Sequence, residues 1–128
     1  MVEDVAWHRQ EEHIYGSVGD DKLLKLWDTR QSKSVFSVEA HSEEVLCLDF
    51  SSFNTNLLLT GSVDKTVAFW DRRNLRSKVH NFSQHKEEVN CVKFHPHHEN
   101  LFATGSSDRR IIVWDVSKVD QPLTEEER

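Results

Sequence analysis

Residues 61–71, GSVDKTVAFWD, place Asp64 in a turn six residues before Trp70, which is itself followed by an aspartate. The Trp-Asp pair recurs at steps of 43 and 44 residues, at Trp27-Asp28, Trp70-Asp71 and Trp114-Asp115. An aspartate stands six residues before each of these tryptophans, and an aromatic residue stands twenty before it: Asp21, Asp64 and Asp108, and Trp7, Phe50 and Phe94. Three anchors in one register across three copies indicate a tandem repeat.

Each copy contains segments typical of short β-strands separated by turn residues. The first segments are VEDVAWH, EEVLCLDF and EEVNCVKF, the second HIYGS, NLLLTG and NLFATG, and the third LLKLWD, TVAFWD and RIIVWD. Weaker fourth segments, SVFSVEA and KVHNFS, follow only the first two Trp-Asp pairs. We therefore expect an all-β chain with a partial first unit (1–40), a second unit (41–84), a third unit without its outer strand (85–116) and an acidic, disordered tail (117–128).

Composition limits the classes of function. The 128 residues are 37% apolar and 30% charged, which suits a folded domain with a core. A net charge of −6 argues against a sequence-independent binder of phosphate backbones, and it favours a basic partner. The sequence shows neither an apolar run of membrane-spanning length nor a secretory signal pattern, so we expect an intracellular protein.

The two cysteines, Cys47 and Cys91, occupy the same place in successive repeats, on apolar strand patterns. This position predicts buried free thiols in preference to a disulfide.

A buried indole needs an acceptor for its ring N–H, and a repeat with Trp in a fixed place must supply that acceptor in a fixed place too. Threonines stand four residues before two of the turn aspartates, and histidines stand nine before two of the first-strand phenylalanines. The order Trp to Thr to His to Asp is the predicted hydrogen-bonded network. It consists of His41, Thr60, Asp64 and Trp70 in the second unit and of His85, Thr104, Asp108 and Trp114 in the third, while the first unit has only Ser17, Asp21 and Trp27.

Two catalytic or metal-binding readings compete with this structural one. Asp, His and Thr also form hydrolytic triads, but here each threonine lies inside an apolar strand, where a nucleophile would not be exposed. The run His95-Pro96-His97-His98 could suggest zinc, yet its neighbours follow no familiar ligand spacing, so a solvated loop is favoured. Gly-rich phosphate loops are absent from the sequence. We therefore expect no enzyme, no metal and no cofactor.

A repeat of this length with four strands and a terminal Trp-Asp resembles the WD40-type β-propeller, in which each repeat forms about one blade of a ring of four to eight. Longer phrases are more specific: GSVGDD, WDTR, AHSEEVLCLDF, TGSVDKTVAFWDRRNL and DRRIIVWDVSK. Together they resemble the histone-binding WD-repeat family, which includes the retinoblastoma-associated proteins and the small subunit of chromatin assembly factor. The likeness runs from Val2 to about Val119 and corresponds to three middle blades of an incomplete seven-bladed ring.

The resemblance implies a non-catalytic histone-binding subunit in the nucleus, shared among chromatin assembly, deacetylase, remodelling and Polycomb-type complexes. It implies core histones or their basic tails as partners, without sequence-specific nucleic-acid binding or a membrane. One histone site of the family lies between a long N-terminal helix and an acidic loop that this chain lacks, so that site is not transferred. The second, an acidic mouth of the central channel, would correspond here to Glu3, Glu44, Glu88 and Asn90, near Asp4, Glu43 and Glu87. A solvated acidic loop is the alternative for these residues.

Two other functional readings stay open. WDTR, ending at Arg30, and WDRR, ending at Arg73, match a Trp-Asp-x-Arg pattern by which some WD-repeat proteins resemble substrate receptors of cullin ubiquitin ligases. Both arginines could instead pair with carboxylates at the strand ends. A truncated product without binding activity is the third reading.

Overall fold

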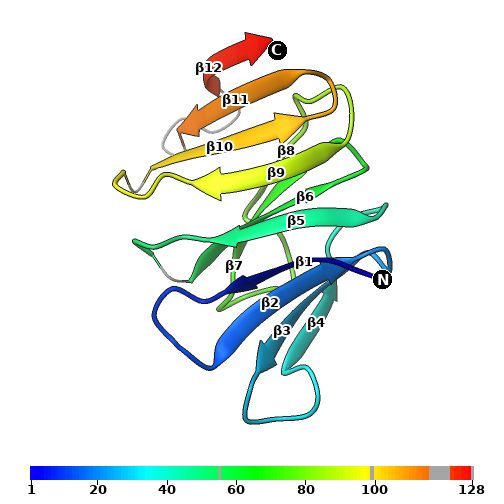
Figure 1. Ribbon diagram of the computed structural model, residues 1–128, viewed down its shortest axis with the longest axis vertical. Helices are drawn as coiled ribbons and strands as arrows, with labels where there is room; N and C mark the ends of the chain where they lie inside the picture. The colour runs from blue at the N-terminus through cyan, green and yellow to red at the C-terminus, as the bar shows by residue number, and fades with distance from the viewer. Residues whose placement is uncertain (55, 99, 116–121, 128) are drawn as a thin grey trace.

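The computed structural model describes residues 1–54, 56–98 and 100–115, and the backbone of 122–127. Every element in these residues is a β-strand, and the strands form three four-stranded antiparallel sheets stacked one after another (Figure 1). The first sheet contains β1 (Val2–Trp7), β2 (Ile14–Gly19), β3 (Leu23–Asp28) and β4 (Phe36–Glu39). The second contains β5 (Val45–Phe50), β6 (Leu57–Ser62), β7 (Val67–Asp71) and β8 (His80–Phe82). The third contains β9 (Val89–Phe94), β10 (Leu101–Ser106), β11 (Arg110–Asp115) and β12 (Pro122–Glu127).

Within each sheet the strands follow chain order, so every connection is a hairpin between neighbours. The turn between the second and third strands has the same form in all three sheets. Its third residue has a positive φ, at Lys22 (71°), Lys65 (74°) and Arg109 (69°), directly after the turn aspartate. The repeat seen in the sequence is therefore a repeat of backbone conformation as well.

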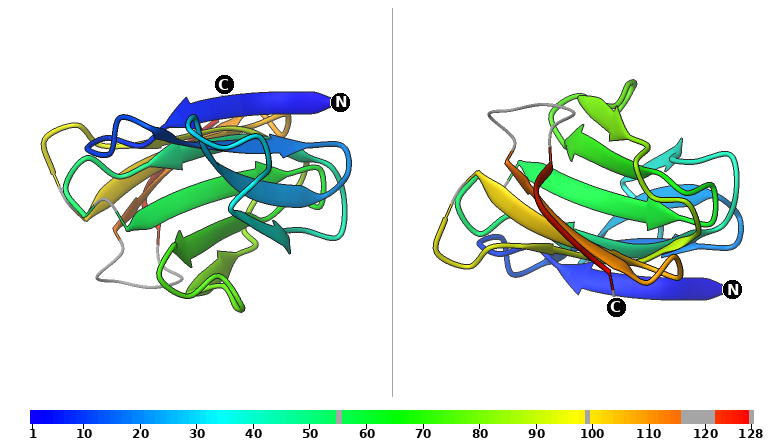
Figure 2. Two further views of the ribbon diagram at one scale, coloured as in Figure 1. Left: turned by 90° about the horizontal axis from the view of Figure 1, so that it is seen from below. Right: turned by 90° about the horizontal axis from the view of Figure 1, so that it is seen from above.

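The first strands of the sheets, β1, β5 and β9, lie side by side and run in the same direction (Figure 1). In both views of Figure 2, β1 lies at one margin of the molecule and the green segment around β8 at the opposite one. Two carboxylates join the first strands across sheets. Asp4 accepts the backbone N–H of Leu48 at 3.1 Å, and Asp49 accepts that of Phe94 at 2.8 Å.

Two apolar layers hold the stack together, one at each joint between sheets. The first joint packs the first sheet on the second and includes Val18, Leu24, Leu26, Leu48, Phe50, Leu58 and Trp70. The second joint packs the second sheet on the third and includes Cys47, Leu59, Val67, Phe69, Phe102, Ile112 and Trp114. At each joint the later sheet contributes its tryptophan, Trp70 or Trp114, each about 1% exposed.

The structure differs from the sequence predictions in two places. The third sheet has an outer strand, β12, which pairs antiparallel with β11 where the sequence predicted none. Residues 116–121 and 128 of the predicted disordered tail lie outside the described residues. Cys47 is buried as predicted, but the prediction is wrong for Cys91, which is exposed because its side of the third sheet has no neighbouring sheet within the described residues.

Candidate functional site

The second sheet contains a continuous polar network, the second brace, formed by His41, Thr60, Asp64 and Trp70. Trp70 Nε1 donates to Thr60 Oγ1 at 2.9 Å, Thr60 Oγ1 lies 2.8 Å from His41 Nε2, and His41 Nδ1 lies 2.9 Å from Asp64. In the tautomer that satisfies every partner, the Thr60 hydroxyl donates to His41 Nε2 and the His41 Nδ1–H donates to the carboxylate. The brace thereby ties the loop before β5 to β6, β7 and their turn.

The third sheet repeats these contacts in the third brace, formed by His85, Thr104, Asp108 and Trp114. The distances are 2.9 Å from the indole to Thr104, 2.7 Å from Thr104 to His85, and 3.0 Å from His85 to Asp108. The partners and their order match the sequence prediction in both sheets.

The first sheet has a shorter version of the brace. Trp27 Nε1 donates to Ser17 Oγ at 2.8 Å, and Asp21 accepts the backbone N–H of Leu23 at 3.1 Å. Ser17 therefore stands where the other sheets have threonine.

The carboxylate at the end of each full brace is held ionised. Burial by itself raises the pKa of Asp64, but hydrogen bonds from His41 and Thr66 outweigh it and leave that pKa well below its ordinary value. Burial opposes ionisation at Asp108 as well, and the backbone N–H of Lys86 together with His85 lowers its pKa. Both aspartates thus accept from the loop and the turn at once.

The chemistry of the braces is structural. Thr60 is fully buried and Thr104 is about 1% exposed, and each hydroxyl is engaged on two sides by the indole and the imidazole. A substrate therefore has no access to either hydroxyl, and the arrangement does not present a nucleophile.

The candidate binding surface, the rim, consists of Glu3, Glu44, Glu88 and Asn90, at or just before the starts of β1, β5 and β9. Glu3, Glu44 and Asn90 are exposed and Glu88 is half-buried. Because the three strands run side by side in one direction, these residues lie along the same edge of the molecule (Figure 1). The rim has two register positions, since Glu44 and Glu88 are equivalent in their repeats, as are Glu3 and Asn90.

Serines that sequence reasoning missed fix the rim. Ser62 Oγ donates to the carbonyl of Glu44, and Ser106 Oγ donates to that of Glu88, both at 2.7 Å. Ser107 Oγ joins two rim side chains, because it accepts from Asn90 Nδ2 at 2.9 Å and donates to Glu88 at 3.1 Å. The signal for the first two was present in the sequence, as serines placed two residues before Asp64 and Asp108.

The two arginines of the Trp-Asp-x-Arg pattern fold back on their own turns. Arg30 donates Nε and Nη2 to Asp28 at 2.9 and 2.6 Å, and Arg73 makes the same fork on Asp71 at 2.9 and 2.5 Å. The Arg30 fork lowers the pKa of Asp28 to about 2. Both arginines therefore have the strand-end carboxylate partners that the sequence allowed.

The histidine run after β9 is organised by its own backbone. His95 Nδ1 accepts the N–H of His97 at 2.9 Å, and His98 Nδ1 accepts the N–H of Asn100 at 3.2 Å. Among the residues that the structure describes, no group of three or more His, Cys, Asp or Glu side chains is arranged to hold a metal ion.

Asp49 is a structural residue that the sequence analysis did not identify. It lies in β5 and is buried, and besides the N–H of Phe94 in the third sheet it accepts from Arg9 Nη2, in the loop that joins β1 and β2 of the first sheet, at 2.9 Å. One carboxylate therefore joins all three sheets. A single polar residue in the apolar run VLCLDF was the only available signal.

No helix in the described residues is long and apolar enough to cross a membrane.

Comparison with known protein families agrees with this architecture. The model of the family described as WD domain, G-beta repeat matches residues 1–28, 32–71 and 76–115, and each matched segment ends at a Trp-Asp pair that closes the third strand of a sheet. The chain therefore belongs to the WD40-repeat family, and its three sheets are blades of a partial β-propeller that serves as a protein-interaction scaffold.

Proposed function

We propose that this chain is a non-catalytic scaffold that binds Arg- and Lys-rich histone tails at the rim, as a subunit of nuclear chromatin complexes. The WD40 repeats support a role in protein interaction. The histone specificity, the chromatin complexes and the nuclear location rest on the sequence resemblance described above.

The observation that carries the proposal is the position of the carboxylates. Glu44 and Glu88 occur in register at the starts of adjacent first strands, and their backbones are held in the same way by Ser62 and Ser106. A carboxylate can accept two parallel hydrogen bonds from a guanidinium group, and a charge-assisted bond of this kind contributes about 1.5–3 kcal/mol. A basic peptide lying across the starts of β1, β5 and β9 would meet Glu3 and Asn90 as further contacts.

The ligase-receptor reading gains no support from the geometry, because Arg30 and Arg73 both engage the aspartate of their own turn. We therefore do not propose it as a second function.

The test is a titration of a fluorescent Arg- and Lys-rich histone-tail peptide against the wild type and Glu44→Lys/Glu88→Lys, at low and high salt. The wild type should bind and should weaken as salt rises, since ionic contacts are screened. The double variant should lose at least about tenfold in affinity, the equivalent of about 1.4 kcal/mol.

The matched control is Glu12→Lys/Glu39→Lys, which makes the same change in net charge at two exposed residues away from the first strands. It should keep most of the wild-type affinity. If both double variants fold and bind the peptide equally well, the rim is not the binding surface.

A further inference from the structure

The two internal joints are formed by equivalent positions of successive repeats. The second sheet turns Leu48, Phe50, Leu58, Ala68 and Trp70 toward the first sheet, and it turns Cys47, Leu59, Val67 and Phe69 toward the third. The third sheet repeats the first of these sets with Val92, Phe94, Phe102, Ile112 and Trp114, which pack against the second. Each joint therefore packs a tryptophan-bearing face on the opposite face of the preceding sheet.

The first sheet has the same tryptophan-bearing face, and no sheet in the described residues covers it. We call this set of residues the N-face. They are the first-sheet equivalents of Leu48, Phe50, Leu58, Ala68 and Trp70, each 43 residues earlier in the chain: Val5, Trp7, Tyr15, Lys25 and Trp27. Val5 is 50% and Trp7 57% exposed, although their counterparts at the joints are buried or half-buried. The aromatic rings form a row, with Trp7 and Tyr15 centroids 5.3 Å apart and Tyr15 stacked on Trp27 at 6.1 Å.

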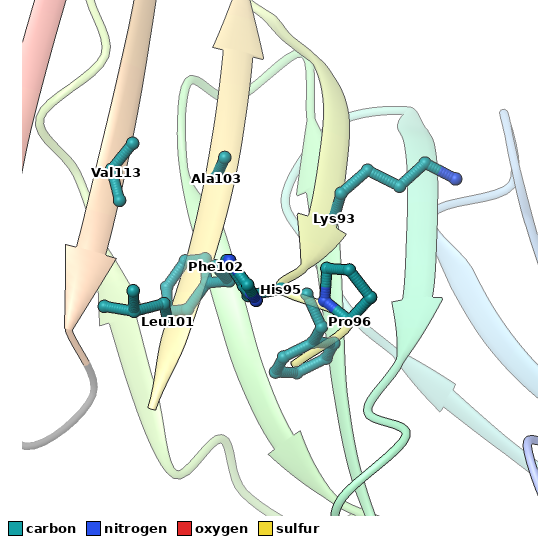
Figure 3. A pocket seen from close by; sticks show the side chains of 8 residues that line it. Lys93, His95, Pro96, Leu101, Phe102, Ala103 and Val113 are labelled. Carbon is teal, nitrogen blue, oxygen red and sulfur yellow. The ribbon is translucent and has the colours of Figure 1, made fainter. Parts of the chain in front are cut away.

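The third sheet has the complementary face, which the described residues likewise leave open. We call it the C-face; its residues, in the register of Cys47, Leu59, Val67 and Phe69, are Cys91, Ala103, Ile111 and Val113. Figure 3 looks onto this face, with Ala103 and Val113 on neighbouring strands and the second sheet behind them. Two hollows of about 260 and 180 Å³ share Ala103 as a lining residue.

The two faces are matched in size. The N-face has a larger side chain than the second sheet at three of its five positions, including Trp7 where the other sheets have Phe50 and Phe94, although Val5 is smaller than Leu48. The C-face has a smaller side chain at two of its four positions, with Ala103 in the place of Leu59 and Val113 in the place of Phe69, whereas Ile111 is larger than Val67. Extra volume on one face and missing volume on the other allow the close packing that a joint requires.

From this register and size match we propose that two copies of the chain associate head-to-tail, the N-face of each on the C-face of the other. The joint continues the interface already present twice within the chain, with Trp27 of one copy in the role of Trp70 and Trp114. Two such joints related by a two-fold axis give a closed dimer of six blades, within the four to eight that propellers contain. Lys25 stands where Ala68 and Ile112 are fully buried at the internal joints, so its aliphatic stem would pack in the new joint while its Nζ lies 3.8 Å from Asp21 and over the Trp27 ring.

The test measures the molar mass of the full chain by sedimentation equilibrium and light scattering. The wild type should approach twice the chain mass as concentration rises and stop there. Trp7→Arg blocks the N-face and Val113→Arg blocks the C-face, so each variant alone should remain a monomer. Equal amounts of the two should form a heterodimer, because one intact N-face and one intact C-face remain.

Val79→Arg is the matched control, because it adds the same charge at an exposed apolar residue outside both faces and should dimerise like the wild type. Each variant is checked for folding by circular dichroism. A wild type that stays monomeric up to about 100 μM overturns the proposal. Dimers of Val113→Arg alone, or a mixture that fails to pair, overturn head-to-tail packing, and open polymers beyond the dimer overturn closure.

Discussion

Thr60 is the residue on which the second brace depends, because its one hydroxyl serves both the indole of Trp70 and the imidazole of His41. Thr60→Val keeps the shape and removes the hydroxyl, so two buried polar groups lose their partner. We expect a loss of about 1–3 kcal/mol for each unsatisfied group in the free energy of unfolding, measured by urea denaturation.

Thr29→Val is the control for this prediction, since Thr29 is exposed and its hydroxyl contacts only His13 at 3.1 Å among the bonds described. It should change stability by less than about 0.5 kcal/mol. Equal urea midpoints for the two variants would show that the second brace contributes no stability.

The ionised aspartates of the two braces give stability a predictable dependence on pH. The pKa values of Asp64 and Asp108 are lowered in the folded state, so their contribution is fully present above the unfolded-state value of about 3.9 and is lost as pH falls below it. Asp64→Asn/Asp108→Asn should be less stable than the wild type at pH 7 and should lose less stability between pH 5 and pH 2. Thermal melts across that range measure both slopes, and Glu12→Gln, at an exposed carboxylate, should run parallel to the wild type.

At the residue scale, the sequence predicts those contacts that the repeat presents more than once. The braces could be predicted because Trp, Thr, His and Asp recur at fixed spacings and a buried indole needs an acceptor. Asp49 could not be predicted, because it occurs in one repeat only and its partners, Arg9 and Phe94, belong to other sheets. Ser107 was missed for a similar reason, since its role depends on the side chains of Glu88 and Asn90.

At the element scale, the joint between the second and third sheets depends on a glycine. A Cβ at Gly61 would come within 2.7 Å of both Cys47 Sγ and Val89 Cγ1 in the closed second joint. Gly61→Ala should therefore destabilise the chain by about 1–3 kcal/mol through overpacking, and Val89→Ala in the same chain should recover part of the loss.

Gly105 is the matched control for this element, because it holds the same register position in the third sheet and lines a hollow of the C-face. In dilute protein, Gly105→Ala should cost less than Gly61→Ala by guanidinium denaturation. An equal cost would mean that backbone conformation at this position matters and that packing between blades does not.

The elements themselves were predictable to different degrees. The first, second and third strands of each sheet combine apolar alternation with turn residues in register, and the structure confirms them. The strand β12 was not predicted because PLTEEE has little apolar alternation, and its pairing depends on the exposed edge of β11. Cys91 was predicted to be buried because it holds the same position in its repeat as Cys47. Burial at this position requires a further sheet packed against the strand, and the sequence of the strand does not show whether such a sheet is present.

At the scale of the whole molecule, the stack is a row of blades that contact their neighbours, and Asp49 in the middle blade contacts both of its neighbours. Repeat proteins gain stability from such contacts between neighbours. The Asp49 side chain is 4% exposed and its partner Arg9 is 49% exposed, so the two residues should contribute unequally. The part-buried N–H of Phe94 has its hydrogen-bond acceptor in this carboxylate, whereas Arg9 can be solvated by water.

We therefore expect Asp49→Ala to cost about 1.5–3 kcal/mol, since it removes charge-assisted bonds to two other sheets. Arg9→Gln should cost less than about 1 kcal/mol, because a half-exposed ion pair is screened. Asp49→Asn should fall between them, since its amide oxygen can still accept the N–H of Phe94. Guanidinium denaturation followed by Trp fluorescence gives the three values, and its slope reports whether the blades still unfold together. If Arg9→Gln costs as much as Asp49→Ala, the ion pair between the first and second sheets carries the effect, and the bond from Asp49 to the third sheet does not.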